Sequence, residues 1–336
     1  MPLEQLAVDL INIPSITGSE NAVLSYLEEF GKSHQLLVRR LPVIENRYNI
    51  LLSHTPEPSI LFCTHCDTVP PFIDARIENG KVYGRGSCDA KGILATMLHT
   101  LLELPEEHAK HTGLLVVVGE ETDSIGAKSL SPEILNADFI ILGEPTENQL
   151  VSAQKGCCIF ELNASGIAAH SGYPEQGSSA VNLLLEQLEL LSRENWGQNT
   201  ILGKSSFNIG TISGGEAANM VPSSATASCS IRLVDDSIKT VDRLQQLLLP
   251  HIDLSIKTAS NPVHLYVPEG YDSIVVGYGS DASYLQKLAP VILCGPGSIL
   301  QAHRPDEHIR ISDLYTAQER YKTLTANLLT SINKGA

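Results

Sequence analysis

The sequence is poor in aromatic and in basic residues, and each shortage restricts what the protein can bind. Its 336 residues include 10 tyrosines, 6 phenylalanines and 1 tryptophan. Stacking on aromatic side chains is a main way of holding single-stranded nucleic acid, so that function is disfavoured. Only 23 basic residues oppose 38 acidic ones, a formal net charge of −15, and the basic residues form no cluster. Nucleic-acid binding in general is therefore disfavoured, while a cationic substrate is permitted.

Long apolar runs, a basic leader segment and paired cysteine motifs are missing as well. No apolar run reaches the roughly 18 residues of a membrane span, and the N-terminal MPLEQLAVDL lacks the basic start of a signal peptide. Seven cysteines are present, and after Cys63 and Cys66 no second pair at zinc-ribbon spacing follows. We therefore expect a soluble cytoplasmic protein with reduced thiols and no membrane partner.

What is present is the pattern of an α/β protein. Helical apolar spacing covers residues 3–13 and 21–31, and again 93–104. Short apolar runs of strand length occur at Ile50–Leu52, Ile60–Cys63, Leu114–Val118 and Phe139–Leu142. Apolar strands alternating with helices predict a mostly parallel, mixed sheet flanked by helices.

The pattern changes after about residue 155. Alternating strands are predicted at 158–164, 206–212 and 225–233, with helices at 180–192 and 238–249, an α+β ferredoxin-like order. Short apolar strands return after Pro262, and a helix at 311–332 ends the chain. We therefore predict a catalytic domain made of 1–155 and 263–336, interrupted by an inserted domain at 156–262.

Acidic residues and histidines follow the apolar strands, at the edge where open α/β sheets bind ligands. They are His65 and Asp67 in LFCTHCDTVP, Asp89 in VYGRGSCDAKG, Glu120 and Glu121 in LLVVVGEE, Glu144 in FIILGEPTE and His303 in ILQAHRPDEHI. Taken one at a time, each of these residues could be an ordinary surface residue or a helix N-cap. Together, so many carboxylates would repel one another unless a cation held them. Histidine with carboxylate suits zinc, with manganese or cobalt as substitutes, and a pair of metals would need a bridging carboxylate.

Six motifs, in order, resemble those of the dinuclear-zinc amidohydrolases, and the match covers nearly the whole chain. They are HCDTVP, GRGSCDAKG, GEE, GEPT, AHSGYP and AHRPDE. That superfamily includes acetylornithine deacetylase, succinyl-diaminopimelate desuccinylase, aminoacylase and glutamate carboxypeptidase. The resemblance implies that the inserted domain is a lid that also forms a homodimer.

The resemblance also implies the role of each motif residue. Asp89 would bridge two divalent metal ions, with His65 and Glu144 completing one site and Glu121 and His303 the other. Zinc is the expected ion.

Two further acidic residues would act beside the metals. Asp67 would hydrogen-bond His65 and fix its tautomer. Glu120 would be the general base that deprotonates the attacking water and returns the proton to the leaving amine.

Three residues of the inserted domain resemble substrate-binding residues. His170 would stabilise the tetrahedral oxyanion, with a turn-stabilising histidine as the alternative. Asn219 and Arg232 would bind the substrate α-carboxylate, with ordinary surface pairing as the alternative. The YGSDAS segment, with Gly279, resembles a substrate-side loop whose glycine could instead serve a tight turn.

The choice of substrate follows from one local difference. Relatives that remove succinyl groups carry an arginine pair after GEPT, whereas this chain has SAQKGCCIFEL. A neutral acyl group such as acetyl is therefore favoured, and the predicted reaction is deacetylation of N-acetyl-ornithine in arginine biosynthesis. N-acetyl-lysine and N-acetyl-citrulline are close alternatives. A desuccinylase, a carboxypeptidase, a dipeptidase or aminopeptidase, and a non-catalytic metal-binding protein also stay open.

Overall fold

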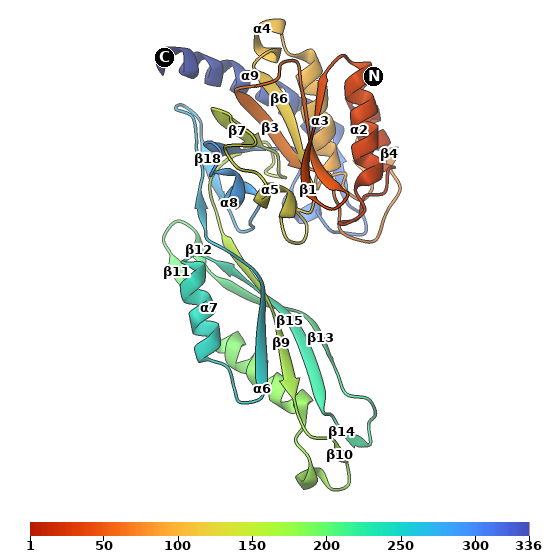
Figure 1. The fold of residues 1–336 in the computed structure, drawn as a ribbon, viewed down its shortest axis with the longest axis vertical. Helices are drawn as coiled ribbons and strands as arrows, with labels where there is room; N and C mark the ends of the chain where they lie inside the picture. Colours follow the sequence, from red (N-terminus) through yellow and green to blue (C-terminus); the bar gives the residue numbers. More distant parts are fainter. Residues whose placement is uncertain (336) are drawn as a thin grey trace. The chain divides into compact units, whose positions relative to one another are not determined.

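The computed structural model describes residues 1–335, and its chain divides into two compact units (Figure 1). Unit 1 holds Met1–Ser152, Leu265–Ile274 and the described residues from Ser280 onward, and unit 2 holds Ala153–His264 and Val275–Gly279. The segment 156–262 that we expected as an insertion lies within unit 2, which also takes in short stretches on either side of it. Within the described residues no helix is long and apolar enough to cross a membrane.

A mixed sheet forms the centre of unit 1, in the order β1-β2-β6-β3-β7-β19-β8. Its four inner strands β6, β3, β7 and β19 are parallel, and the strands on both sides are antiparallel. The bounds are β1 (Leu37–Ile44), β2 (Arg47–Ser53), β3 (Ile60–His65), β6 (Thr112–Val117), β7 (Phe139–Leu142), β8 (Leu150–Gln154) and β19 (Val291–Leu293). The predicted fold class, a mostly parallel mixed sheet flanked by helices, is confirmed.

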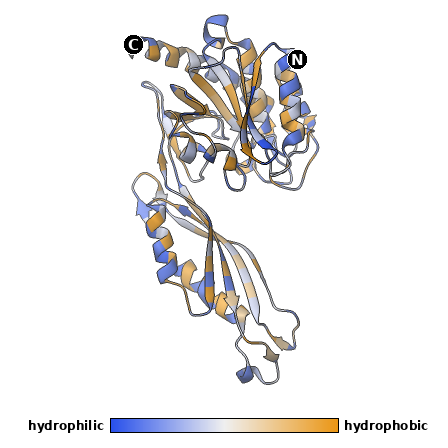
Figure 2. Ribbon diagram, in the orientation of Figure 1, coloured by the Kyte–Doolittle hydropathy of each residue, from blue (hydrophilic) through white to orange (hydrophobic). Residues whose placement is uncertain are grey.

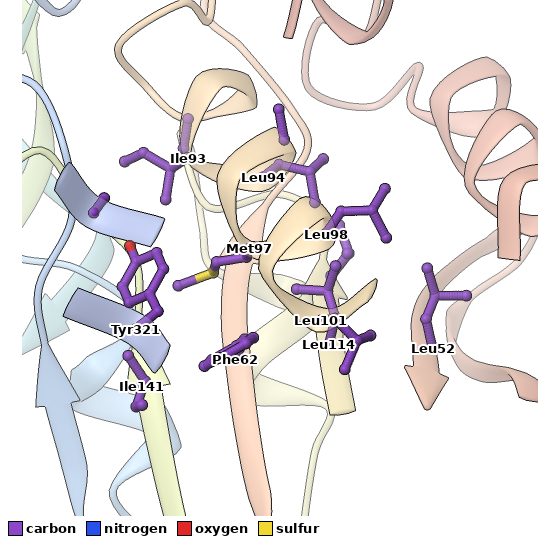
Figure 3. Close-up of a cluster of buried hydrophobic side chains, with 14 of the residues drawn as sticks. Leu52, Phe62, Ile93, Leu94, Met97, Leu98, Leu101, Leu114, Ile141 and Tyr321 are labelled. Atoms are coloured by element: carbon purple, nitrogen blue, oxygen red, sulfur yellow. The ribbon is translucent and has the colours of Figure 1, made fainter. Parts of the chain in front are cut away.

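Helices cover this sheet and bury one of its faces. Alternate residues of β3 and β6, among them Phe62 and Leu114, share a core with α3, α9 and the first two helices. Figure 3 shows Met97 and Leu101 of α3 above Phe62, with Tyr321 of α9 beside them. The helices of unit 1 are α1 (Leu3–Ile11), α2 (Asn21–Ser33), α3 (Lys91–Glu103), α4 (Glu106–Ala109), α5 (Ile125–Lys128), α8 (Ala282–Leu285), the 3₁₀ turn η2 (Ile299–Gln301) and α9 (Ile311–Gly335).

A small three-stranded sheet, in the order β20-β5-β4, also belongs to unit 1. Its strands are β4 (Arg76–Glu78), β5 (Lys81–Tyr83) and β20 (His308–Arg310). Strand β18 (Ser273–Val276) begins in unit 1 and pairs with β8.

Unit 2 is built on a four-stranded antiparallel sheet, in the order β13-β15-β9-β16. Helices α6 and α7, which carry both hydrophobic and hydrophilic residues (Figure 2), pack against its buried positions. The main elements are β9 (Gly156–Ser165), α6 (Ala180–Arg193), β13 (Ser206–Gly214), β15 (Ser224–Leu233), α7 (Ser237–Gln246) and β16 (Ile252–Ser260). Their order along the chain is the predicted ferredoxin-like one, completed by β16, which the sequence pattern did not indicate.

Short elements complete unit 2. They are β10 (Ala169–His170), η1 (Pro174–Gln176), β11 (Gln198–Asn199), β12 (Gly203–Lys204), β14 (Met220–Val221) and β17 (Val263–His264).

Two helices end earlier than their apolar spacing predicts. The first ends at Ile11 instead of residue 13, and α7 ends at Gln246 instead of residue 249. In each case the predicted end directly precedes a proline, Pro14 or Pro250. The proline ring disfavours helical backbone at the residue before it, so the helix ends sooner.

Candidate metal centre

Parallel strands bring most of the predicted site residues of unit 1 to one edge of the sheet. His65 is the last residue of β3, Glu144 lies two residues beyond β7, and Glu120 and Glu121 follow β6. Because β6, β3 and β7 are parallel neighbours, their carboxyl ends meet at the same edge. The order of the strands therefore explains why these separate motifs converge.

Close packing of α3 brings Asp89 toward the same edge. Asp89 lies just before α3, in a cis peptide with Ala90. A Cβ on Gly143 would lie 2.4 Å from the Ile93 side chain and 2.6 Å from that of Met97. Glycine at this position thus lets α3, which follows Asp89, approach the strand end that precedes Glu144.

The carboxylate of Asp89 lies between two histidines. Its Oδ1 is 3.1 Å from Nε2 of His65, and its Oδ2 is 3.5 Å from Nε2 of His303. Nε2 of His303 is also 3.0 Å from Oε2 of Glu121. His303 has left-handed backbone, with φ 64°, a conformation that histidine adopts more readily than most residues.

Two groups of side chains in this cluster could each hold a metal ion. One consists of His65, Asp89 and Glu144 and the other of Asp89, Glu121 and His303. In each group the potential ligand atoms lie within 4.8 Å of one another. Since Asp89 belongs to both groups, its two oxygens can serve two neighbouring ions.

The charges and orphaned atoms of the cluster fit divalent cations. Glu144 is 4% exposed, and its Oε1 has no hydrogen-bond partner among the described residues. Burial raises the pKa of Glu144 well above its usual value, and the nearby Asp89 raises it further. Burial likewise raises the pKa of Glu121. A cation would supply the missing partner and remove the cost of crowding these carboxylates, and the imidazole and carboxylate donors suit zinc, cobalt or manganese.

Asp67 does more than the sequence indicated. Its backbone carbonyl is 3.0 Å from Nδ1 of His65, closer than its carboxylate, which is 3.5 Å away. The carboxylate instead accepts hydrogen bonds from the backbone N–H groups of residues 119, 120 and 121 and from the hydroxyl of Thr17, at 2.7–3.2 Å. Asp67 therefore holds the turn that carries Glu120 and Glu121, in addition to its contact with His65.

The network around Asp67 predicts a measurable effect on folding. Asp67→Asn places an amide N–H₂ where the carboxylate accepted backbone N–H groups, so at least one buried donor loses its partner. We expect the free energy of unfolding, measured by urea denaturation of chelated protein, to fall by about 1–3 kcal/mol. Thr17→Val removes only one of the four hydrogen bonds to this carboxylate and leaves the three backbone bonds intact, so it should cost less than Asp67→Asn. Equal losses in the two variants would contradict this account.

Glu120 is a half-buried carboxylate beside the two ligand groups. Desolvation raises its pKa well above the usual value, and the negative charges of Glu144, Asp281 and Glu121 act in the same direction. It belongs to neither ligand group. A carboxyl group with a raised pKa next to a metal centre is suited to exchanging a proton.

The other three predicted site residues belong to unit 2. His170 is exposed, and its Nδ1 accepts a hydrogen bond from the backbone N–H of Gly172 at 3.0 Å. Asn219 is exposed, and its backbone carbonyl accepts from the N–H of Ser171. Arg232 is half-buried on β15, opposite Cys157 of β9.

Sequence reasoning missed Thr17 and Glu307, and it assigned Asp281 only to the substrate-side loop YGSDAS. Thr17 bonds Asp67 from 50 positions away, and no local pattern indicates such a contact. Glu307 lies inside the AHRPDE motif, which could have pointed to it. Asp281 is 1% exposed, neither of its carboxylate oxygens has a hydrogen-bond partner among the described residues, and burial raises its pKa to about 6.

Comparison with known proteins identifies the family. Residues 61–327 match peptidase family M20/M25/M40, so the chain belongs to that family. A peptidase M20 domain-containing protein of Schizosaccharomyces pombe is 38% identical, covering 96% of this chain and 84% of its own. A protein of Aspergillus flavus named a probable carboxypeptidase is 36% identical, covering 97% and 90%. The M20 family metallo-carboxypeptidase of Sulfolobus solfataricus has the same fold, with a TM-score of 0.79 at 17% identity over 97% and 99% of the two chains.

These relatives confirm the predicted class, a metal-dependent hydrolase of this superfamily. None of the three is named for deacetylation of acetylornithine.

Proposed function

We propose that the protein hydrolyses an amide bond next to a free carboxylate, as a metal-dependent carboxypeptidase or N-acyl amino acid deacylase. The main support for this proposal is that the two candidate ligand groups share Asp89. Glu120 lies beside both groups and belongs to neither. His65 and Glu144 would hold one ion, Glu121 and His303 the other, with zinc expected and cobalt or manganese as substitutes. Bound divalent ions supply Lewis acidity, which polarises a substrate carbonyl and lowers the pKa of water.

The chain itself supplies the proton transfers. In this proposal Glu120 takes the proton of the attacking water and passes it to the departing amine. Its raised pKa supports this role, because a stronger base takes the proton of the attacking water more readily. Asp67 fixes the backbone of residues 119–121 and so the direction in which Glu120 points.

Unit 2 would bind the substrate. We propose that His170 donates a hydrogen bond to the developing oxyanion and that Asn219 and Arg232 bind the α-carboxylate. The planar guanidinium of Arg232 can make two parallel bonds to a carboxylate, which supports this role. A homodimer formed through residues 156–262 and a reducing, cytoplasmic location belong to the same proposal. The seven unpaired cysteines are consistent with that location.

The relatives named carboxypeptidase favour a substrate whose acyl part is a peptide or amino acid. Deacetylation of N-acetyl-ornithine is the second candidate. It is favoured by the stretch around Lys155, which offers no arginine pair for a second carboxylate. Both reactions release an amino acid with a free α-carboxylate.

Matched substrate pairs test this proposal. We expect chelated enzyme, resupplied with Zn²⁺, Co²⁺ or Mn²⁺, to cleave N-acylated dipeptides or N-acetyl amino acids with a free C-terminal carboxylate. Amidation of that carboxylate should lower kcat/KM at least about 10²-fold, because Arg232 would lose its charged partner. Within the panel, N-acetyl-ornithine, N-acetyl-lysine and N-acetyl-citrulline are compared with N-succinyl-diaminopimelate and with blocked and free dipeptides. An aminopeptidase would instead require the free amine and tolerate amidation, and that result would refute the proposal.

A further inference from the structure

A buried ion pair supports the turn that carries Asp89, and the mechanism above does not use it. Glu307 and Arg85 are 1% and 3% exposed, and Oε2 of Glu307 lies 2.6 Å from Nη1 of Arg85. Nη1 of Arg85 also donates to the backbone carbonyl of Arg304 at 3.1 Å. Neither carboxylate oxygen of Glu307 is part of a ligand group.

The other carboxylate oxygen of Glu307 holds the turn itself. Oε1 accepts hydrogen bonds from the backbone N–H groups of Gly86 at 3.0 Å, Cys88 at 3.1 Å and Asp89 at 3.2 Å. Gly86 has φ +87°, and a Cβ there would lie 2.9 Å from the Thr68 side chain. Three N–H groups converging on one oxygen fix the path of the turn up to and including the backbone of Asp89.

The same residue ties this turn to the segment that carries His303. Strand β20, which begins at His308, pairs with β5, and the backbone N–H of Gly84 donates to the carbonyl of Glu307. His303 precedes Glu307 by four residues and faces Oδ2 of Asp89. Glu307 therefore connects the turn that contains Asp89 with the segment that contains His303.

We propose that Glu307 is a positioning residue of the metal centre, which holds the backbone of Asp89 so that its carboxylate is shared between the two ligand groups. The proposal rests on the proposed function, because it takes Asp89 to be a metal ligand. Glu307 and Asp67 act in the same way, because the carboxylate of each accepts hydrogen bonds from three backbone N–H groups of one turn. The turn held by Glu307 carries Asp89, and the turn held by Asp67 carries Glu120 and Glu121.

Glu307→Gln tests this with the metal as the probe. Groups that orient metal ligands typically contribute 10–100-fold to metal affinity. We expect chelator-stripped Glu307→Gln to bind Zn²⁺ about 10–100-fold more weakly than wild type in competition with a chromophoric chelator. The visible spectrum of the Co²⁺-loaded variant, which reports ligand geometry, should change as well. Asp306→Asn is the matched control, since it removes the neighbouring exposed carboxylate, which pairs with Arg304, and should stay within about twofold of wild type.

A second variant separates positioning from folding. Glu307→Gln leaves Arg85 buried without its partner, which lowers stability, and the double variant Arg85→Met/Glu307→Gln removes that buried charge. If the double variant regains urea stability and still binds Zn²⁺ weakly with an altered Co²⁺ spectrum, the proposal holds. Wild-type affinity and spectrum in either variant overturn it. A wild-type protein that binds no metal would refute the proposed function instead.

Discussion

Glu120→Gln is expected to lower kcat by about 10²–10⁴-fold, the usual contribution of a positioned general base. The amide keeps the size of the side chain but cannot accept a proton from water or deliver one to the leaving amine. The backbone N–H of residue 120 still bonds to Asp67, so the turn should stay in place. Steady-state hydrolysis of the substrate selected from the matched panel measures the effect.

Metal content is the internal control for this variant. Because Glu120 belongs to neither ligand group, Glu120→Gln should bind as much Zn²⁺ as wild type, whereas Glu121→Gln should bind less. Glu29→Gln, on the exposed side of α2, makes the same chemical change away from the centre and should leave kcat unchanged. Turnover of Glu120→Gln close to wild type would refute its role as the base.

Removal of metal is expected to abolish hydrolysis and to destabilise unit 1. Each ion present at 100 times its Kd adds about 2.7 kcal/mol to the free energy of unfolding, which chelation would take away. Activity should return when Zn²⁺, Co²⁺ or Mn²⁺ is added back to the chelated protein. Full activity after exhaustive chelation, verified by elemental analysis, would contradict a metal-dependent mechanism.

The same centre predicts how metal affinity depends on pH. Without metal, the hydrogen bonds that His303 donates to the carboxylates of Asp89 and Glu121 raise its pKa to about 10, so its imidazole is protonated at neutral pH. A metal-binding imidazole must be neutral, so binding an ion releases that proton. Apparent affinity should therefore rise from pH 6 to pH 8 and stop rising near pH 10. An affinity independent of pH across this range would show that His303 is not a ligand.

The sequence predicts those strands that are buried along their whole length. Strands β3 and β6 are buried along their whole length, so each contains an unbroken apolar run, residues 60–63 in β3 and 114–117 in β6, and both strands were anticipated. Strand β1 was not predicted, because it lies at the edge of the sheet and has no apolar run. Five of its residues, including Arg40, are exposed. Strand β16 alternates mostly half-buried and exposed positions, which weakens its signal in the same way.

The candidate ligands could be predicted from their motifs, but the residues that position them through hydrogen bonds could not. A candidate ligand such as Asp89 or His303 has a side-chain chemistry that a short sequence motif shows directly. Thr17 acts through a hydrogen bond to the Asp67 carboxylate 50 positions away, and Glu307 acts through hydrogen bonds from backbone N–H groups more than 200 positions away. Backbone donors carry no side-chain signature, so only the folded chain shows which carboxylate they meet.

The shared carboxylate of Asp89 makes the two proposed ion sites one thermodynamic system. An ion bound by His65, Glu144 and Asp89 would restrict the orientation of the Asp89 carboxylate, which the second proposed ion would also use. Linkage then requires the second ion to change the affinity of the first by the same factor. A substitution at His303 should therefore also change the metal affinity of the site that contains His65. A change in the metal preference of either site would alter the affinity of the other.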